Sequence, residues 1–543
     1  MRALTGLPSG RGEVLCDTCR ELSRLPPARA TMAPHSAHGL GARPSSPDPS
    51  PPPPSCRGED AAPSPLEASA AQLAKGAAPS DDDDDAPMMA SRSNKEARPG
   101  RECPYLDTIS RHSLDFDFEK CCSVSLSPVN VYACLVCGHY FQGRGPSTHA
   151  SAHALETGHH MYMKLEDGRV YCLPEGYEVL DRSLDDIRAV LRPRFEAGEV
   201  AKLDADKGAS WKRAIDGIDF MPGLVGLNNM RANDYVNVTL QMLARVTALR
   251  DYFLSPANYE GCKSELVQRF GELLMKLWNP RNFKGQVSPH EFMRAVMRES
   301  GKRFVIDAQS DPGEFLSWLV NSLHLGLTNG KRRKPSIITR CFQGTLKVLT
   351  EAGTGPAAGQ SEDLVTETPF LMLTLDLPPA PVFQDASEQN IIPQVMVQEV
   401  LRKYSGETVT EDVKLGRRRF RLSRLPKYLI LNVRRFSRNQ FLLEKNPTIL
   451  NFPVKNLDLA ESVREEDLGG ASGRFDLLAS ITHEGPTRMQ VDKSVKAMPG
   501  TWRAFVHRRA EDAWYEVQDL AVTEVLPQAV ALSEAYLQVY EMQ

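Results

Sequence analysis

Cysteines and histidines with the spacing of metal ligands are concentrated in one short segment of the chain. The segment Tyr132 to His160 reads YACLVCGHYFQGRGPSTHASAHALETGHH. Zinc in proteins takes four Cys or His ligands in a tetrahedron, and a CxxC pair followed by spaced histidines supplies such a set. We expect one zinc site built from Cys134, Cys137, His153 and His159. The spacing leaves a second site open, with candidate ligands Cys103, Cys121 or Cys122, and His149.

A second stretch whose residues could take part in chemistry runs from Gly226 to Gln241 and reads GLNNMRANDYVNVTLQ. Val236 and Leu240 recur at helical spacing, and Asn233 and Asp234 occupy the place of a helix N-cap. The N-terminus of a helix concentrates partial positive charge, so enzymes place thiolates and oxyanions there. The group available here is the carboxylate of Asp234. This location should lower its pKa and make it a weak base.

The composition of the chain does not point to a nucleic-acid-binding, membrane or disulfide-rich protein. The 543 residues are 41% hydrophobic and 25% charged, with a formal net charge of −4. These values are typical of a soluble globular protein and give no whole-chain argument for nucleic-acid or membrane binding. Nine of the eleven cysteines precede residue 173. This clustering favours a metal site in a reducing compartment over a disulfide framework, so we expect an intracellular protein.

The elements that position these residues divide the chain into four parts. Residues 1–100 are rich in Pro, Ala, Ser and Gly, carry five aspartates from Asp81 to Asp85, and are predicted to be a disordered low-complexity tail. A lone CxxC at Cys16 and Cys19 has no second pair nearby, and a proline run from Pro44 to Ser55 is typical of a spacer. We assign residues 101–195 to a zinc module, 196–214 to a linker and 215–543 to the main domain. Leu184, Ile187 and Leu191 predict one helical face at the end of the zinc module.

The main domain resembles the ubiquitin-specific protease family in six motifs that occur in the family's order. These are the stretch from Gly226, QSDPGEFLSWLVNSLH from Gln309, LPKYLILNVRRF from Leu425, NFP followed by LDL from Asn451, FDLLASITHEG from Phe475, and EAYLQVY from Glu534. The resemblance implies a papain-like α+β fold of palm, thumb and fingers. The segment CGHYFQGRG with its histidines resembles the zinc finger of the ubiquitin-protease type. The fold predicted for the chain is therefore a UBP-type finger followed by a protease-like domain.

Each catalytic position implied by the resemblance is substituted. Asp234 stands where the family has its nucleophilic cysteine, Thr501 where it has its histidine base, and Gln518, followed by Asp519, where it has the residue that orients the base. Only Asn229, which matches the family's oxyanion-hole asparagine, is retained. A carboxylate attacking an amide would have to form an unfavourable mixed anhydride. We therefore expect a pseudoenzyme, and interpret His483 and His507 as core or surface histidines.

The finger differs from ubiquitin-binding members of its family at one position. His139 replaces an arginine that helps hold the free C-terminal tail of ubiquitin. A neutral imidazole clamps a carboxylate less well than a guanidinium does, so we do not expect this finger to capture ubiquitin.

A UBP-type finger followed by a protease domain without its cysteine and histidine resembles the inactive, splicing-associated branch of the family. This resemblance implies a nuclear scaffold that helps assemble or maintain the spliceosomal tri-snRNP. It would bind tri-snRNP proteins, and small nuclear RNA only indirectly. The exposed-looking run Lys331 to Lys334 is either a nuclear-localisation signal, an RNA contact or a solvated loop. Two alternatives remain: a ubiquitin-binding module without catalysis, and a residual deubiquitinase.

Overall fold

The computed structural model describes residues 103–205, 211–350, 364–379, 393–412, 416–439, 441–460, 463, 472–490 and 499–543. The predictions made for the first hundred residues, including the tail itself and the Cys16–Cys19 pair, lie outside these ranges. No helix of the described part is both long and apolar enough to cross a membrane.

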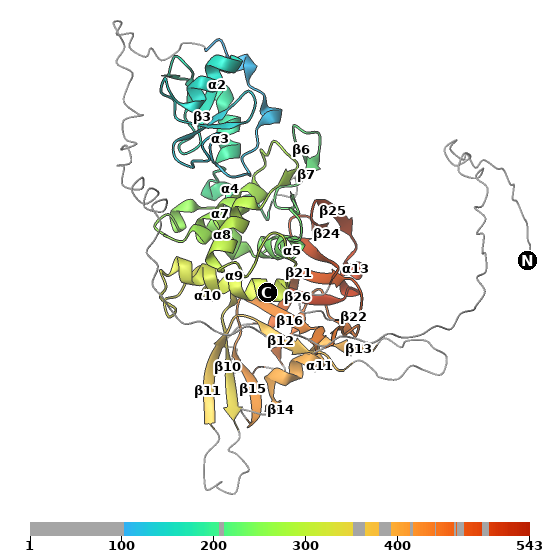
Figure 1. Cartoon of the computed structure of the whole chain (residues 1–543). Coiled ribbons are helices and arrows are strands. Elements are labelled where there is room, and N and C mark those ends of the chain that lie inside the picture. The colour runs from blue at the N-terminus through green and yellow to red at the C-terminus, as the bar shows by residue number, and fades with distance from the viewer. Residues whose placement is uncertain are drawn as a thin grey trace, which may run out of the picture. The chain divides into compact units, whose positions relative to one another are not determined.

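The zinc module is a five-stranded antiparallel sheet with two helices (Figure 1). Its strand order is β2-β1-β3-β4-β5. The elements are β1 (Val131–Cys134), β2 (Tyr140–Gln142), α2 (His149–Thr157), β3 (Met161–Lys164), β4 (Val170–Cys172), β5 (Tyr177–Glu178) and α3 (Asp185–Leu191). Leu184, Ile187 and Leu191 are all buried, which confirms the predicted apolar face. We call this module the finger.

The connecting segment after the finger is more ordered than a linker. It contains α4 (Ala197–Lys202), which begins with a capping box between Glu196 and Glu199. Val200 and Leu203 pack against the core of the main domain. Only residues 206–210 of the predicted linker, 196–214, are left undescribed. The exact domain boundaries stay a prediction.

A helical layer forms the first half of the main domain. Its helices are α5 (Asp234–Leu243), α6 (Thr247–Phe253), α7 (Glu265–Trp278), α8 (His290–Glu299), α9 (Pro312–Leu327) and α10 (Ile337–Phe342). Short strands β6 (Lys212–Arg213) and β7 (Asp219–Phe220) form one pair, and β8 (Gly226–Leu227) and β9 (Gln286–Val287) form another. Helix α5 is central, because all ten of its residues are buried. Helix α9 contains most of the motif that starts at Gln309, and the Asp311 side chain caps it by accepting a hydrogen bond from Glu314 N.

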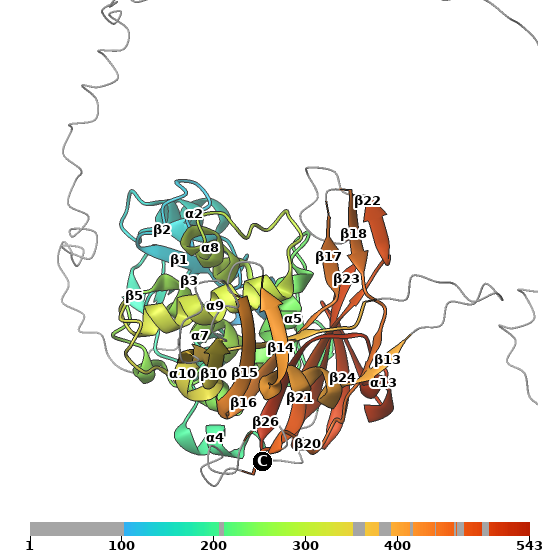
Figure 2. The ribbon, with the colours of Figure 1, turned by 90° about the horizontal axis from the view of Figure 1, so that it is seen from below.

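A large, mostly antiparallel sheet forms the second half and supports α5 on one face (Figure 2). Its strands, in spatial order, are β12 (Leu373–Asp376), β16 (Tyr428–Arg434), β26 (Ala535–Met542), β21 (Arg474–Glu484), β23 (Thr501–Arg508), β24 (Ala513–Gln518) and β25 (Ala521–Val525), with β20 (Leu457–Asp458) paired to β21. The motifs that start at Leu425 and Phe475 form the buried strands β16 and β21. Helix α5 packs across β21, β23 and β24, so the degenerate catalytic positions meet at this contact.

A separate four-stranded sheet projects from the second half. Its order is β11 (Leu364–Phe370), β10 (Gly344–Thr350), β15 (Gly416–Arg424) and β14 (Ser405–Asp412). The remaining elements are β13 (Gln394–Met396) paired with β19 (Ile449–Asn451), the small sheet of β17 (Phe436–Arg438), β18 (Leu442–Lys445) and β22 (Arg488–Gln490), and the helices α11 (Val397–Leu401) and α13 (Pro527–Ala531). Helices on a central sheet, with a second sheet beside them, confirm the predicted α+β fold.

Polar contacts join the finger's first segment to the helical layer. Lys276 Nζ on α7 donates to Phe116 O at 2.9 Å and to Asp117 Oδ1 at 2.8 Å. The other carboxylate oxygen of Asp117 accepts a hydrogen bond from Ser288 N at 2.8 Å. Lys284 also pairs with Asp115. Since Lys276 is buried, this ion pair is shielded from water and from salt.

Candidate functional site

The structure brings the four predicted zinc ligands together. The ligand atoms of Cys134, Cys137, His153 and His159 all lie within 4.8 Å of one another. Cys134 Sγ is 3.6 Å from His159 Nδ1, Cys137 Sγ is 3.4 Å from His153 Nε2, and the two histidine nitrogens are 3.2 Å apart. Ligands bound to zinc at about 2.0–2.3 Å in a tetrahedron are separated by about 3.3–3.8 Å. The donor set and its geometry therefore fit one zinc ion.

Local backbone geometry places these ligands. Cys134 ends β1, and Cys137 follows in the tight turn before β2. Helix α2 carries His153 and ends at Gly158, whose φ of +71° is the left-handed conformation that lets the chain reverse direction. His159 follows at once and returns to the cysteines. Without a cation, burial raises the pKa of the Cys134 thiol to about 12, a cost that a bound metal would remove by stabilising the thiolate.

The candidates for a second zinc site do not come together. The described residues contain a single cluster of three or more potential ligands, and it is the one above. Cys103 Sγ lies 3.2 Å from the Tyr177 hydroxyl within the finger's core. Cys122 Sγ instead accepts the backbone N–H groups of Val124 and Ser125, each at 3.4 Å. This sulfur organises a tight turn, a role that spacing could not reveal.

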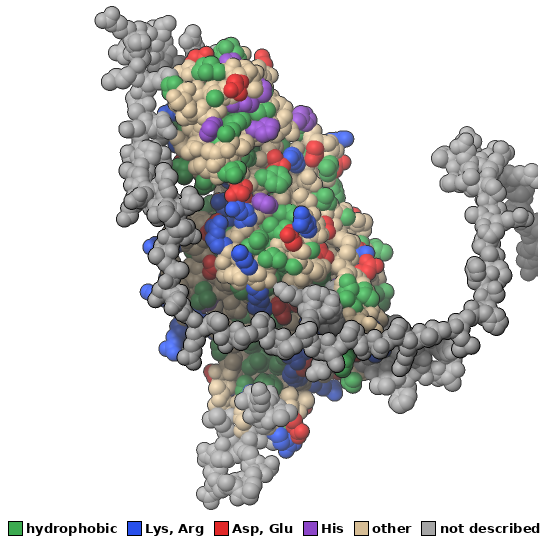
Figure 3. All heavy atoms as spheres, viewed as in Figure 1, with side chains coloured by type: hydrophobic (Ala, Val, Ile, Leu, Met, Phe, Trp, Pro, Cys, Tyr) green, Lys and Arg blue, Asp and Glu red, His purple; other side chains and the backbone are tan. Residues whose placement is uncertain are grey.

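His139 is exposed on the finger. Figure 3 shows several histidine side chains on the face of the finger that is in view. The backbone carbonyl of His139 accepts a hydrogen bond from Cys134 N at 2.9 Å, so the residue is part of the turn that carries the metal ligands. The expectation that it weakens ubiquitin capture stays a prediction.

At the position of the family's nucleophile, Asp234 is the first residue of α5 and is only 4% exposed. Its Oδ2 accepts hydrogen bonds from Trp502 N and from Gln309 Nε2, both at 3.1 Å. Its Oδ1 accepts from Tyr235 N at 2.9 Å. The carboxylate therefore links α5 to the start of β23 and to the segment before α9. The motif that starts at Gln309 gives no sign of this contact, because the two residues are 75 positions apart.

The expected pKa of Asp234 was wrong in direction. Burial raises its pKa above the ordinary value, and the nearby Asp519 carboxylate acts in the same direction. The hydrogen bonds from Trp502, Gln309 and Tyr235 lower the pKa but do not outweigh burial. The sequence argument considered only the helix terminus, whereas the side chain's loss of water depends on packing from distant segments.

The retained Asn229 is also held by neighbouring groups. Its Nδ2 donates to Asp519 Oδ2 at 2.9 Å, and its Oδ1 accepts from Asn233 N at 3.2 Å. Asn237 Nδ2 donates to the other oxygen of Asp519 at 2.8 Å. Asp519 has a φ of +50°, which aims its side chain from the end of β24 toward these amides. One of the two Nδ2 hydrogens of Asn229 is thus already donated to Asp519.

The other two degenerate positions differ in exposure. Thr501 is exposed at the first position of β23, and Gln518 is half-buried at the end of β24. His483 is buried beside Trp502, with ring centroids 4.7 Å apart. His507 Nε2 lies 2.9 Å from Asp512 Oδ1. His483 is thus a core histidine, whereas His507, whose side chain is 12% exposed, lies between core and surface.

A wide groove of about 820 Å³ lies between α9 and the strands β16 and β17. Asp311, Glu314 and Trp318 line one side, and Arg434 and Phe436 line the other. Trp502, the residue whose N–H binds Asp234, also lines it. The groove therefore reaches the neighbourhood of the substituted nucleophile.

The basic run from Lys331 to Lys334 lies in the exposed loop between α9 and α10. His324 Nε2 lies 3.0 Å from Arg332 O, which fixes the backbone of the loop. The run is thus a solvated loop, and its role in localisation or RNA binding stays a prediction.

Comparison with known sequences places these features in a family. The family described as "Ubiquitin carboxyl-terminal hydrolase" matches residues 225–540, and "Zn-finger in ubiquitin-hydrolases and other protein" matches residues 121–184. The chain belongs to the ubiquitin carboxyl-terminal hydrolase family. It is 46% identical over 472 residues to human "Ubiquitin carboxyl-terminal hydrolase 39", an alignment that covers 83% of this chain and 81% of the relative.

Two further relatives carry names that refer to splicing. "Probable mRNA-splicing protein ubp10" of Schizosaccharomyces pombe is 42% identical over 80% of this chain and 88% of the relative. "Pre-mRNA-splicing factor SAD1" of Saccharomyces cerevisiae is 27% identical over 81% of this chain and 93% of the relative. Among solved structures, "Crystal structure of an essential yeast splicing factor" matches with a TM-score of 0.65 and 25% identity, covering 81% of this chain and 99% of that one.

Proposed function

We propose that this protein is a non-catalytic splicing factor of the nucleus that helps assemble or maintain the spliceosomal tri-snRNP. The observation that carries the proposal is the 42% identity to a relative named as an mRNA-splicing protein, over 88% of that relative's length. The match extends over both the finger and the protease-like domain. The partners are tri-snRNP proteins, and any contact with small nuclear RNA is made through them.

The geometry at the degenerate centre supports the absence of catalysis. Isopeptide hydrolysis by this family needs a thiolate, an imidazole base and a group that orients the base. Asp234 accepts hydrogen bonds from three N–H groups, and attack by it would require the loss of those bonds. Thr501 has no basic side chain, and the carboxamide of Gln518 cannot act as a base. We therefore propose that the fold serves binding and not turnover.

A fluorogenic ubiquitin substrate tests this part of the proposal. We expect no turnover above the uncatalysed rate by the full chain. Turnover that Asp234→Ala abolishes, while Thr501→Ala leaves it unchanged, would establish a residual deubiquitinase that uses the carboxylate.

We propose that Cys134, Cys137, His153 and His159 bind one zinc ion in the finger. All four positions are protein ligands, so the ion has no open coordination position for catalysis and is structural. When bound, zinc supplies a fixed crosslink between the end of β1, the following turn and α2. The residues themselves supply two thiolates and two imidazoles, and the left-handed Gly158 aligns the last of them.

A ubiquitin-binding or ubiquitin-like-binding module without catalysis is the second candidate. The groove of about 820 Å³ that runs to Trp502 favours it, since it is large enough for an extended peptide. His139 argues against a contribution from the finger. Calorimetry with free ubiquitin tests this candidate on the full chain, and saturable binding that Trp318→Ala removes would support it.

Purification of a tagged full chain from nuclear extract tests the splicing proposal. We expect tri-snRNP proteins and their small nuclear RNAs to co-purify, and the RNAs to be lost when the proteins are stripped by high salt. Recovery of ubiquitin conjugates without spliceosomal RNA would contradict the proposal and favour the second candidate.

A further inference from the structure

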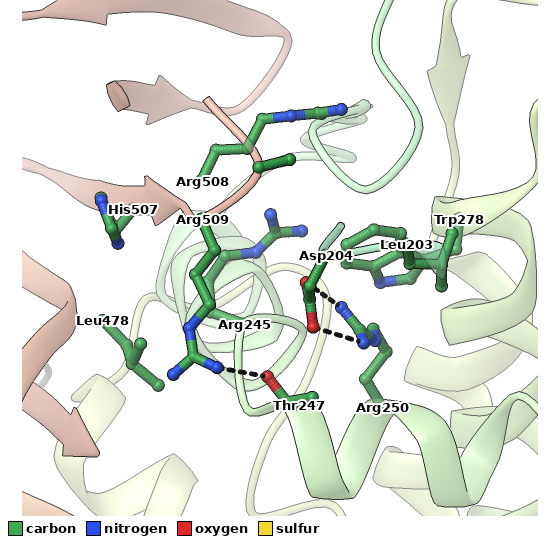
Figure 4. Close-up of a pocket in the computed structure, with 11 residues that line it drawn as sticks. Leu203, Asp204, Arg245, Thr247, Arg250, Trp278, Leu478, His507, Arg508 and Arg509 are labelled. Carbon is green, nitrogen blue, oxygen red and sulfur yellow. Dashed lines mark hydrogen bonds and ion pairs between the residues drawn. The ribbon is translucent and has the colours of Figure 1, made fainter. Parts of the chain in front are cut away.

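Four arginines surround a small cavity that contains none of the candidate zinc ligands or degenerate catalytic positions (Figure 4). Arg245 and Arg250 flank the beginning of α6, and Arg508 and Arg509 follow one another at the end of β23. Trp278, the last residue of α7, completes the wall. The cavity itself measures about 20 Å³, which is enough for one water-sized species and too small for an organic ligand.

Three of the four arginines have carboxylate partners. Arg250 binds both oxygens of Asp204 at 2.8 and 2.9 Å. The remaining pairs are Arg250 with Asp251 at 2.7 Å, Arg508 with Glu511 at 3.5 Å, and Arg509 with Glu541. The positive charges of these three side chains are therefore compensated within the protein.

Arg245 is different. It is 7% exposed, and within the described residues it has no carboxylate at ion-pair distance. Its guanidinium lies 4.8 Å from the centroid of the Trp278 ring and donates one N–H to Gly223 O. Its Nε has no hydrogen-bond acceptor. Burial, followed by the charges of Arg250 and Arg508, lowers the pKa of Arg245 to about 9 even though the Asp204 carboxylate raises it, so the side chain is still a cation at neutral pH.

A second buried donor lines the same cavity. Trp278 is 5% exposed, and its Nε1 also lacks an acceptor among the described residues. Buried N–H groups are almost always paired, and a buried charge needs a counter-charge. Arg245 and Trp278 line one small cavity, and each has a buried N–H without an acceptor; the carboxylate that acts on Arg245, Asp204, is already bound at both oxygens by Arg250.

We propose that this cavity binds a single small inorganic anion of chloride size, held by Arg245 and Trp278. An anion accepts both hydrogen bonds and supplies the missing negative charge. A water molecule would accept the bonds but leave the charge of Arg245 uncompensated. The bound anion would tie Arg245, just before α6, to Trp278 at the end of α7, while the Asp204 carboxylate that lines the same cavity stays bound to Arg250.

Thermal unfolding of the full chain tests the proposal. Chloride is titrated against gluconate, which is too large for the cavity, at constant ionic strength. We expect the midpoint to rise with chloride and to saturate, by roughly 3–5 °C at a hundredfold excess over the dissociation constant. Arg245→Met should abolish this dependence. Trp278→Phe should raise the chloride concentration needed for half of the shift at least several-fold. Arg333→Met in the exposed loop should leave the dependence unchanged.

A chloride-independent midpoint of the wild-type chain, or the same chloride dependence in Arg245→Met, would overturn the proposal. Anomalous diffraction from crystals of the full chain grown in bromide gives a readout that does not depend on how the variants fold. We expect one bromide peak within hydrogen-bond distance of Arg245 Nε and Trp278 Nε1. Density for a water molecule at that place, without anomalous signal, would refute the anion.

Discussion

Asp234 has a structural role at the position where the family resemblance predicts the nucleophile. The carboxylate lies at the start of the central helix α5, where the family's nucleophile stands, and its two oxygens accept N–H groups from three segments. An aspartate there satisfies Trp502 N and Gln309 Nε2, which a thiol could do only weakly. The aspartate therefore adds a contact between the helical layer and the sheet.

Removing this carboxylate should cost stability. In Asp234→Ala, buried N–H groups of Trp502 and Tyr235 lose their acceptor, so we expect the free energy of unfolding to fall by about 1–3 kcal/mol. Chemical denaturation measures the change. The control is Thr501→Ala at an exposed position, which should stay within about 0.5 kcal/mol of wild type. Equal stability of both variants would show that the Asp234 contacts contribute nothing.

The raised pKa of Asp234 determines how its contribution to the free energy of unfolding should change with pH. A carboxyl whose pKa is higher in the folded state binds its proton more tightly there, so its contribution is most favourable below the ordinary value of 3.8. That contribution decreases as the pH rises through the folded-state pKa. The difference in unfolding free energy between wild type and Asp234→Ala should therefore shrink between pH 4 and pH 7. A difference that grows over this range would indicate a lowered pKa.

For single residues, the sequence predicted which side chains lie together better than it predicted how buried each side chain is. The spacing predicted the four candidate ligands of the finger, and the structure brings their side chains together, because a CxxC turn and a helix with histidines constrain each other locally. The direction of the Asp234 pKa was not predictable, because its burial depends on Trp502, which is 268 residues away. Arg245 and Trp278 gave no signal either, since the lack of a partner becomes visible only when four segments are assembled.

Among the elements, the finger depends most on a single interaction. Its strands are short, and α2 is connected to β1 through the two cysteines and two histidines. Cys137→Ser should therefore lose zinc, measured by metal analysis of the purified chain, and lose protection of the finger's amides in hydrogen exchange.

Cys121→Ser is the matched control, because Cys121 lies in the same module but outside the ligand cluster. It should retain one zinc ion per chain and wild-type protection. A loss of zinc in Cys121→Ser, or a content of two ions per chain, would mean that a second site forms from residues that the structure places apart.

Most elements could be predicted from periodicity, and the exception has a physical cause. Strands β16 and β21 and helix α9 each bury apolar residues. The apolar pattern of each element can be read directly in the sequence. The segment 196–214 is polar enough to resemble a linker, yet Val200 and Leu203 pack on the main core. Two apolar residues in a charged stretch do not predict packing, because their partner surface is formed elsewhere in the chain.

For the whole molecule, the ion pair between Lys276 and Asp117 should couple the finger to the protease-like domain. Lys276→Met leaves the Asp117 carboxylate, which is 19% exposed, without its cation. We expect a loss of about 3 kcal/mol, and recovery of most of it in the double variant with Asp117→Leu. Calorimetry measures both, with Lys331→Met as the exposed control. An unchanged transition in Lys276→Met would mean that the two parts unfold independently of this contact.

The central claim is that a protease fold without protease chemistry serves splicing, and splicing in a nuclear extract depleted of this protein tests it most directly. The account predicts that depletion lowers the yield of spliced product. It also predicts that the wild-type chain and Thr501→Ala restore the yield equally, because position 501 supplies no catalytic base. An undiminished yield after depletion would contradict the claim, as would failure of Thr501→Ala to restore splicing when it folds like wild type.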